Sequence, residues 1–429
     1  MSRHGSEHQS GRAGDGLEVR PTVAVVSHVL PFPMVAGQNQ RVRHINEALR
    51  ERFTVKFLVP ERLIDDPVVR RQLEDEVDEV VPIPEARRWP DSVEKTGARL
   101  WAGARGLKPS AWWLGRRMIT PESLTRVMPA DVDLAVFHYC HASEAAAALE
   151  ATGIACVLDM HDVLWRARLA QRSARRARWG PGRSMKRMRQ WEESSWRRFS
   201  GIVAINETEA REVQALLPDT TVFYTPMGLR LDEWPCRWTP ADRATIGYYG
   251  GLSTSRAERE VERLSTRILP LVRDAVPAVE LKVVGSNPSP RIAQLLRGSG
   301  MELVGYVAQP ADVLSQYAAV VCPFVGQYGF RSRVVELMAT GVPVVATPDA
   351  VAGMGFTAGL HVRVEEHDAG LAAAIIELLS DEEQASAQSH AARRFVEAEY
   401  DFASSYRKLA TRLAAWLADR TPEPTKLDS

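Results

Sequence analysis

Two arginines and a glutamate, Arg331, Arg333 and Glu336, lie within six residues of one another between two apolar runs. Guanidinium groups pair well with phosphate oxygens. Free N–H groups of a loop and of a helix start also favour an anion at this place. A carboxylate one turn along the same helix can accept hydrogen bonds from two neighbouring hydroxyls. Phosphate on one side and a diol on the other describe a nucleotide diphosphate sugar.

The elements that hold these residues form a predicted βαβ unit. The apolar run 319–324 predicts a buried strand, and a loop containing Gly326 follows it. Helical spacing over 332–340 stops at a glycine and a proline, and 342–346 predicts a second buried strand. The loop therefore lies at the carboxyl end of a strand, where open parallel sheets bind their ligands.

The stretch GFRSRVVELMATGVPVVAT, residues 329–347, resembles the donor site of the retaining GT-B glycosyltransferases of group 1, also called family four. It is most similar to a subgroup associated with exopolysaccharide and exosortase systems. The resemblance implies that Glu336 binds the ribose and that Arg333 replaces a family lysine beside the diphosphate. Tyr328 stands where the family has another glutamate, which puts in question how the sugar hydroxyls are held.

The resemblance implies further donor contacts on other loops. These candidates are Gly329, Phe330, Arg331, Gly250, Gly251, Arg256, Tyr306, Val307 and Gly37. Glycines let a phosphate approach the backbone closely, although Gly37 could also be a plain turn residue. Tyr306 and Val307 correspond to positions beside the nucleotide base, where backbone groups make the contact. Three predicted strands of the second half end in glycine. This favours a nucleotide-binding sheet over glycines that serve only as turn residues.

His161 and Asp162 follow directly after a predicted strand, 154–160. Both side chains suit general base chemistry, and the resemblance places a loop facing the acceptor here. Asp162 could accept the proton of the acceptor hydroxyl, with His161 as the alternative. Asp162 could instead cap the helix that follows. His138 and His141, beside another predicted strand end, are weaker candidates of the same kind.

Composition limits the class of protein. With 429 residues, 45% of them hydrophobic, the chain can bury two cores of ordinary size. Lys plus Arg equals Asp plus Glu at 54 each, so no global charge favours nucleic acid. The four cysteines are scattered and no apolar run is long enough to span a bilayer, which predicts reduced thiols and a cytoplasmic protein.

The expected fold is α/β, with two facing Rossmann-like domains, a cleft between them and a C-terminal helix that crosses back to the first domain. The predicted units are a disordered tail (1–20), an acceptor-binding domain (21–230), a linker (231–243), a donor-binding domain (244–400), the returning helix (401–420) and a second tail (421–429).

The segment 165–199 combines many arginines and lysines with Trp165, Trp179 and Trp191. Such a segment could lie against the inner face of a membrane or bind a phosphorylated acceptor. Binding of single-stranded nucleic acid is disfavoured because the rest of the chain is neutral. A solvated helical face with its tryptophans packed inward is the other interpretation.

These patterns predict transfer of a sugar from a nucleotide diphosphate sugar to an acceptor hydroxyl, with retention at the anomeric carbon. The acceptor could be a small molecule, a glycan or a lipid-linked glycan, in polysaccharide, glycolipid or natural-product biosynthesis. No metal site and no cofactor beyond the co-substrate are expected, since no His, Cys and Asp set has ligand spacing. A nucleotide-sugar epimerase and a non-catalytic nucleotide-sugar binder remain as alternatives.

Overall fold

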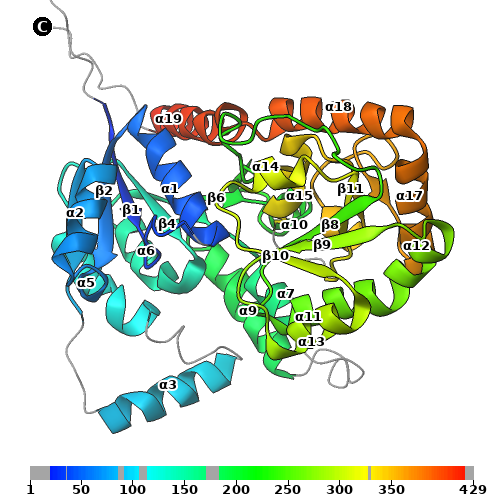
Figure 1. The fold of residues 1–429 in the computed structure, drawn as a ribbon. Helices are drawn as coiled ribbons and strands as arrows, with labels where there is room; N and C mark the ends of the chain where they lie inside the picture. Colours follow the sequence, from blue (N-terminus) through cyan, green and yellow to red (C-terminus); the bar gives the residue numbers. More distant parts are fainter. Residues whose placement is uncertain are drawn as a thin grey trace, which may run out of the picture.

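Two parallel β-sheets, one in each half of the chain, dominate the computed structural model (Figure 1). The structure describes residues 20–34, 36–85, 91–105, 114–170, 183–326 and 330–420. Both predicted tails therefore lie outside the described residues, except for Arg20. The sheets fall on either side of the predicted linker 231–243.

The N-terminal sheet has seven strands in the order β3-β2-β1-β4-β5-β6-β7. Its strands are β1 (Thr22–Val26), β2 (Thr54–Pro60), β3 (Glu79–Ile83), β4 (Leu134–His138), β5 (Ala155–Asp159), β6 (Gly201–Ala204) and β7 (Thr221–Tyr224). Its helices are α1 (Gly37–Arg50), α2 (Pro67–Glu76), α3 (Asp91–Arg105), α5 (Pro121–Val127), α6 (Ser143–Glu150), α7 (Leu164–Ala170), α9 (Arg183–Trp196) and α10 (Glu207–Leu216).

The C-terminal sheet has six strands in the order β10-β9-β8-β11-β12-β13. Its strands are β8 (Thr245–Tyr249), β9 (Glu280–Val284), β10 (Glu302–Gly305), β11 (Ala319–Cys322), β12 (Val344–Ala346) and β13 (Arg363–Val364). The helices of this half are α11 (Ser255–Arg263), α12 (Leu269–Ala275), α13 (Pro290–Ser299), α14 (Pro310–Leu314), α15 (Ser332–Thr340), α16 (Pro348–Val351), α17 (Asp368–Ser380) and α18 (Glu382–Glu399).

Each face of the N-terminal sheet carries its own apolar core, as expected for a parallel sheet covered on both sides. Helices α1 and α2 contribute to one core, and α5, α6, α9 and α10 contribute to the other. The C-terminal sheet and its helices share a single large core. The expected α/β architecture is therefore confirmed.

The chain crosses between the two halves twice, and the two crossings lie side by side. Leu229 pairs with Asp401 in an isolated parallel bridge, and Leu229 N–H donates to the carbonyl oxygen of Tyr400 at 2.7 Å. Beyond this point a short helical turn (Ala403–Arg407) leads into α19 (Lys408–Arg420). Leu409 and Leu413 of α19 pack into an N-terminal core, so the last helix crosses back to the first domain (Figure 1).

The donor-site unit follows the sequence prediction closely. β11 is followed by a loop and then by α15, which begins at Ser332 and ends at Thr340. Gly341 closes the helix with a left-handed backbone, φ 83°, a conformation that glycine adopts without steric cost. β12 then pairs in parallel with β11.

Candidate active site between the two domains

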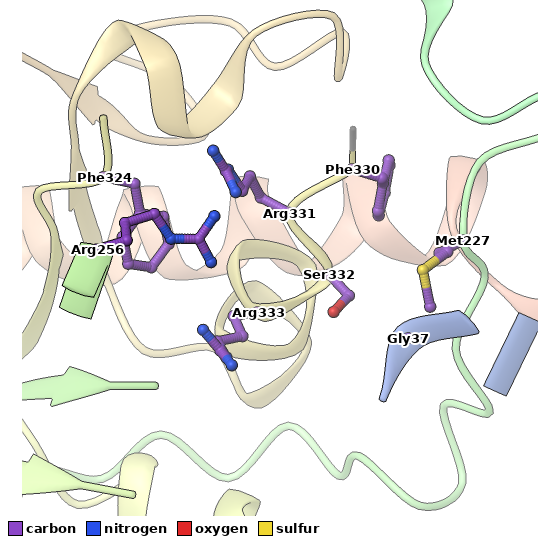
Figure 2. A pocket seen from close by; sticks show the side chains of 8 residues that line it. All are labelled: Gly37, Met227, Arg256, Phe324, Phe330, Arg331, Ser332 and Arg333. Atoms are coloured by element: carbon purple, nitrogen blue, oxygen red, sulfur yellow. The ribbon is translucent and has the colours of Figure 1, made fainter. Parts of the chain in front are cut away.

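Two adjoining pockets lie between the domains, and both are lined by Gly37, Ser332 and Arg333. The smaller also contains Arg256 and Arg331, which lie beside Arg333 and opposite Gly37 of the N-terminal domain (Figure 2). The larger, of about 440 Å³, lies along the carboxyl ends of β8, β9 and β10. That volume is within the ordinary range for small-molecule sites.

The arginines are held by the loops around them. Arg331 Nη2 donates to the carbonyl oxygen of Gly326 at 2.7 Å. Arg333 lies against the double-glycine loop, because a Cβ on Gly250 would lie 3.3 Å from its Nη1 and one on Gly251 3.4 Å from its Nη2. A Cβ on Gly250 would crowd the guanidinium, whereas one on Gly251 would only reach ordinary van der Waals contact with it, so Gly250 makes room for Arg333.

Glu336 lines the larger pocket although only 7% of it is exposed. Burial raises the pKa of its carboxyl, and Arg333 together with hydrogen bonds from Tyr249 and Ser332 acts in the opposite direction. The carboxylate is therefore held in a fixed orientation toward the pocket. It can accept hydrogen bonds from a diol that enters there.

The far end of the larger pocket is formed by the loops after β9 and β10. Tyr306 and Val307 line it together with Gly285, and Tyr306 is 78% exposed. Trp234 of the linker and Gln40 of α1 line the same pocket. The structure thus brings the predicted base-side residues to the same pocket as Arg333 and Glu336.

Gly37 of the N-terminal domain lines both pockets, beside Met227 in the smaller one and beside Met34 and Gln40 in the larger one. A Cβ built there would meet only Met227, at 3.5 Å, which is ordinary van der Waals contact. Gly37 is also absent from the glycines with positive φ. Neither the backbone nor the packing of the described residues requires glycine at this position.

His161 lies in a buried polar cluster beneath the N-terminal side of the cleft. Its Nε2 is 3.1 Å from Asp159 Oδ2 and 3.0 Å from His138 Nδ1, and its ring stacks on Tyr139 at 4.2 Å. Burial lowers the pKa of His161 to about 4, so the ring is neutral at pH 7. The backbone φ of 56° at His161 is rare for a residue with a side chain.

Arg41 of α1 anchors this cluster. Its fully buried guanidinium donates to both oxygens of Asp159, with Nη2 to Oδ1 at 2.6 Å, and to the carbonyl oxygen of Thr225. Burial opposes ionisation of Asp159, but Arg41 and the two histidines hold the pKa of that carboxyl well below its usual value. Arg41 and Asp159 therefore form a buried ion pair, and each of the two side chains makes a further hydrogen bond outside the pair.

The ligand atoms of His138, Asp159 and His161 are close enough together to hold a metal ion. Arg41 already supplies a cation to the Asp159 carboxylate through three hydrogen bonds. A divalent ion beside that buried guanidinium would meet strong like-charge repulsion. We therefore interpret the cluster as a support for the loop above it.

Asp162 is partly buried on that loop. Burial raises the pKa of its carboxyl to about 6, and Arg331, Arg41 and Arg256 act in the opposite direction. Because Arg331 and Arg256 belong to the C-terminal domain, Asp162 lies close enough to that domain to feel the charge of two of its arginines. The helix that follows, α7, has its first N–H groups bound by Glu192, so Asp162 is not needed as its cap.

Sequence reasoning missed several site residues. Arg41 and Asp159 form one ion pair across 118 residues, and Tyr249, Trp234 and Gln40 were not considered. An acidic residue at the end of the otherwise apolar strand β5 was a usable signal for Asp159. The predicted donor residues Tyr328 and Gly329 lie outside the described residues. Phe330 lines the smaller pocket, as expected.

The basic segment 165–199 is only partly described, since 171–182, including Trp179, lies outside the described residues. In the rest, Trp165 and Trp191 pack with Met185 and Met188 in a small apolar cluster that also includes residues of α3. The tryptophans seen here thus face inward. No helix in the described residues is long and apolar enough to cross a membrane.

Residues 243–381 match the family model described as glycosyl transferases group 1. This stretch of the chain is similar to that family. The matched residues include Arg256, Arg331, Arg333 and Glu336, the charged residues of both pockets. No curated protein sequence matches the chain.

Solved structures extend the likeness over nearly the whole chain. A structure of HepE from Anabaena with UDP and glucose has a TM-score of 0.60 at 14% identity, covering 92% of this chain and 100% of that one. Sucrose-phosphate synthase from Thermosynechococcus elongatus has a TM-score of 0.67 at 19% identity, covering 94% and 100%. A glycosyltransferase from Rickettsia africae has a TM-score of 0.63 at 13% identity, again covering 94% and 100%. The predicted GT-B arrangement of two Rossmann-like domains is confirmed.

Proposed function

We propose that this protein transfers a sugar from a nucleotide diphosphate sugar to an acceptor hydroxyl, with retention at the anomeric carbon. The observation that carries the proposal is the convergence of Arg256, Arg331 and Arg333 on one pocket that adjoins the Glu336 pocket. Three cations beside a buried carboxylate suit a diphosphate and a ribose diol in one ligand. The UDP in the HepE structure makes UDP-sugars the first donors to test.

In the proposed reaction the acceptor oxygen forms a bond to the anomeric carbon on the same face from which the diphosphate leaves, while the bond from that carbon to the diphosphate breaks, so that the configuration is retained. The nucleoside diphosphate leaves with the electron pair, and the arginines and the N-terminus of α15 stabilise its charge. Asp162 takes the proton of the acceptor hydroxyl. We favour Asp162 over His161 because His161 Nε2 is already engaged by Asp159 and His138.

A panel of nucleotides and nucleotide sugars tests donor binding. A true donor at free concentration c stabilises the folded protein by RT ln(1 + c/Kd), so the thermal shift grows with the logarithm of its concentration once that exceeds Kd. Release of nucleoside diphosphate that requires an acceptor supports the transferase. Conversion of the donor without an acceptor would support an epimerase, and binding without turnover would support a non-catalytic binder.

The acceptor remains a separate proposal. Exopolysaccharide, glycolipid and natural-product pathways each supply sugar hydroxyls that could reach Asp162. Mass spectrometry of products from mixed acceptor pools, with the donor fixed by the panel, distinguishes them. Retention is tested by NMR of the anomeric proton in the product, and inversion would contradict the proposal.

A further inference from the structure

Glu192 is an acidic residue in the basic segment 165–199, and its carboxylate is buried at the start of another helix. It lies on α9 and is 1% exposed. Its Oε1 accepts from Leu164 N–H at 2.7 Å and its Oε2 from Trp165 N–H at 2.9 Å. Both oxygens are therefore committed to the first turn of α7, which begins two residues after Asp162.

This arrangement is a costly way to cap a helix. A buried carboxylate loses its hydration, and burial raises the pKa of Glu192 to about 8, assisted by the nearby Glu209 and Asp162. Among the described residues no lysine or arginine forms an ion pair with it. A Ser, Thr or Asp next to the helix start would satisfy the same N–H groups locally. The nearest residue able to do so is Asp162, but the N–H groups of Leu164 and Trp165 donate to Glu192 instead.

The loop that carries Asp162 is thus fixed on both sides. On one side His161 is bound to Asp159 and His138 and stacks on Tyr139. On the other side the N–H groups of Leu164 and Trp165 are bound by Glu192. Between these two attachments only Asp162 and Val163 remain, and Val163 is itself buried.

We propose that Glu192 is a positioning residue that holds Asp162 in its orientation toward the donor pocket. By taking over the cap of α7, it frees the Asp162 carboxylate for the acceptor. This inference rests on the proposed function, in which Asp162 receives the acceptor proton. Glu192 itself touches no substrate.

Replacing Glu192 tests the inference. In Glu192→Gln one oxygen still accepts, while the amide NH2 group turns a donor toward the second N–H, so the start of α7 loosens. We expect kcat to fall about 10- to 100-fold with the KM for the donor within about twofold of the wild type, because a displacement on the order of 1 Å at the reacting group has such an effect. Glu193→Gln is the matched control, since Glu193 is the next residue and pairs with Arg189 outside the site. It should leave kcat unchanged.

A second measurement does not depend on turnover. Infrared difference spectra between Glu192→Gln and the double variant Glu192→Gln/Asp162→Asn report the titration of the Asp162 carboxyl. Since burial is the largest cause of its raised pKa, a loosened loop should move the titration to lower pH than in the wild type. The other groups that interact with Asp162, which must be kept constant, are Arg331, Arg41, Arg256 and Tyr139; Glu192 is the group that the experiment changes.

Glu192→Asp guards against a variant that fails to fold, because it keeps the carboxyl group and shortens only its reach. We expect it to lose kcat as Glu192→Gln does. Wild-type kcat in either variant, together with an unshifted Asp162 titration, would overturn the positioning role. If the wild-type enzyme shows no turnover with any donor, the proposed function fails, and the titration still decides whether Glu192 sets the environment of Asp162.

Discussion

Asp162→Asn should make the protein more stable at neutral pH while removing its activity. The wild-type pKa is raised from 3.8 to about 6, chiefly by burial. A folded-state pKa above the unfolded value means that ionisation destabilises the folded state. The cost is absent below pH 3.8, grows between pH 3.8 and 6, and is complete above pH 6. At 1.36 kcal/mol for each pKa unit, it reaches about 3 kcal/mol.

The neutral amide that Asp162→Asn introduces would not bear this cost. We expect the free energy of unfolding of this variant, measured by urea titration, to exceed the wild-type value by up to about 3 kcal/mol at pH 8. The gain should disappear at pH 4, where the wild-type carboxyl is largely protonated. Turnover should fall by about 10²- to 10⁴-fold, as for loss of a general base. In the wild type, kcat/KM should rise with pH through about 6 and then level off.

Asp65→Asn is the matched control for stability, because Asp65 is exposed on the surface of the same domain. Its free energy of unfolding should stay within about 0.5 kcal/mol of the wild type at both pH values. The reasoning is refuted if Asp162→Asn is no more stable than the wild type at pH 8, or if its gain is the same at pH 4. Full turnover in Asp162→Asn would exclude Asp162 as the base. The stability prediction would be unaffected.

Three further substitutions test other parts of the site. Arg333→Ala should lower kcat/KM on the order of 10²-fold in a nucleotide-release assay, because one charge that stabilises the leaving diphosphate is lost; the exposed Arg52→Ala should have no effect. Gly37→Ala should raise the donor KM in the same assay. Its stability in thermal unfolding should be equal to that of the wild type or higher by up to about 1 kcal/mol, because alanine suits a helix better than glycine. A loss of stability there would show that packing requires the glycine. Arg41→Ala should reduce the free energy of unfolding by about 3–5 kcal/mol, since it leaves Asp159 buried without its partner. A reduction no larger than in Arg52→Ala, by urea titration, would contradict the importance of the buried pair.

The sequence predicted the βαβ unit around Arg333 and Glu336 well because its signals are local. α15 has apolar residues at helical spacing, and Gly341 supplies the left-handed residue at its end. Glu336 and Arg333 lie one turn apart on that helix, so their common pocket follows from its geometry. Glycines after β8 and β9 likewise marked strand ends that meet at one edge of a parallel sheet.

The acceptor side was harder to predict because its contacts join distant segments. The ion pair of Arg41 with Asp159 and the cap of α7 by Glu192 depend on how strands and helices pack, which residue spacing does not encode. Sequence reasoning considered Asp162 as either base or cap. The structure argues against the cap, because Glu192 already accepts from the N–H groups that a capping Asp162 would need.

Arg41 links the chemistry of the cleft to the contact between the domains. Its guanidinium reaches Asp159, which supports His161 beneath the Asp162 loop, and also the carbonyl oxygen of Thr225 in the first crossing between the domains. Tyr406, just beyond the second crossing, lies close enough to the same guanidinium to interact with it electrostatically. A rotation of one domain against the other that displaced either crossing would therefore act on the support of Asp162 directly. The orientation of the two domains and the placement of the proposed base thus depend on one buried side chain.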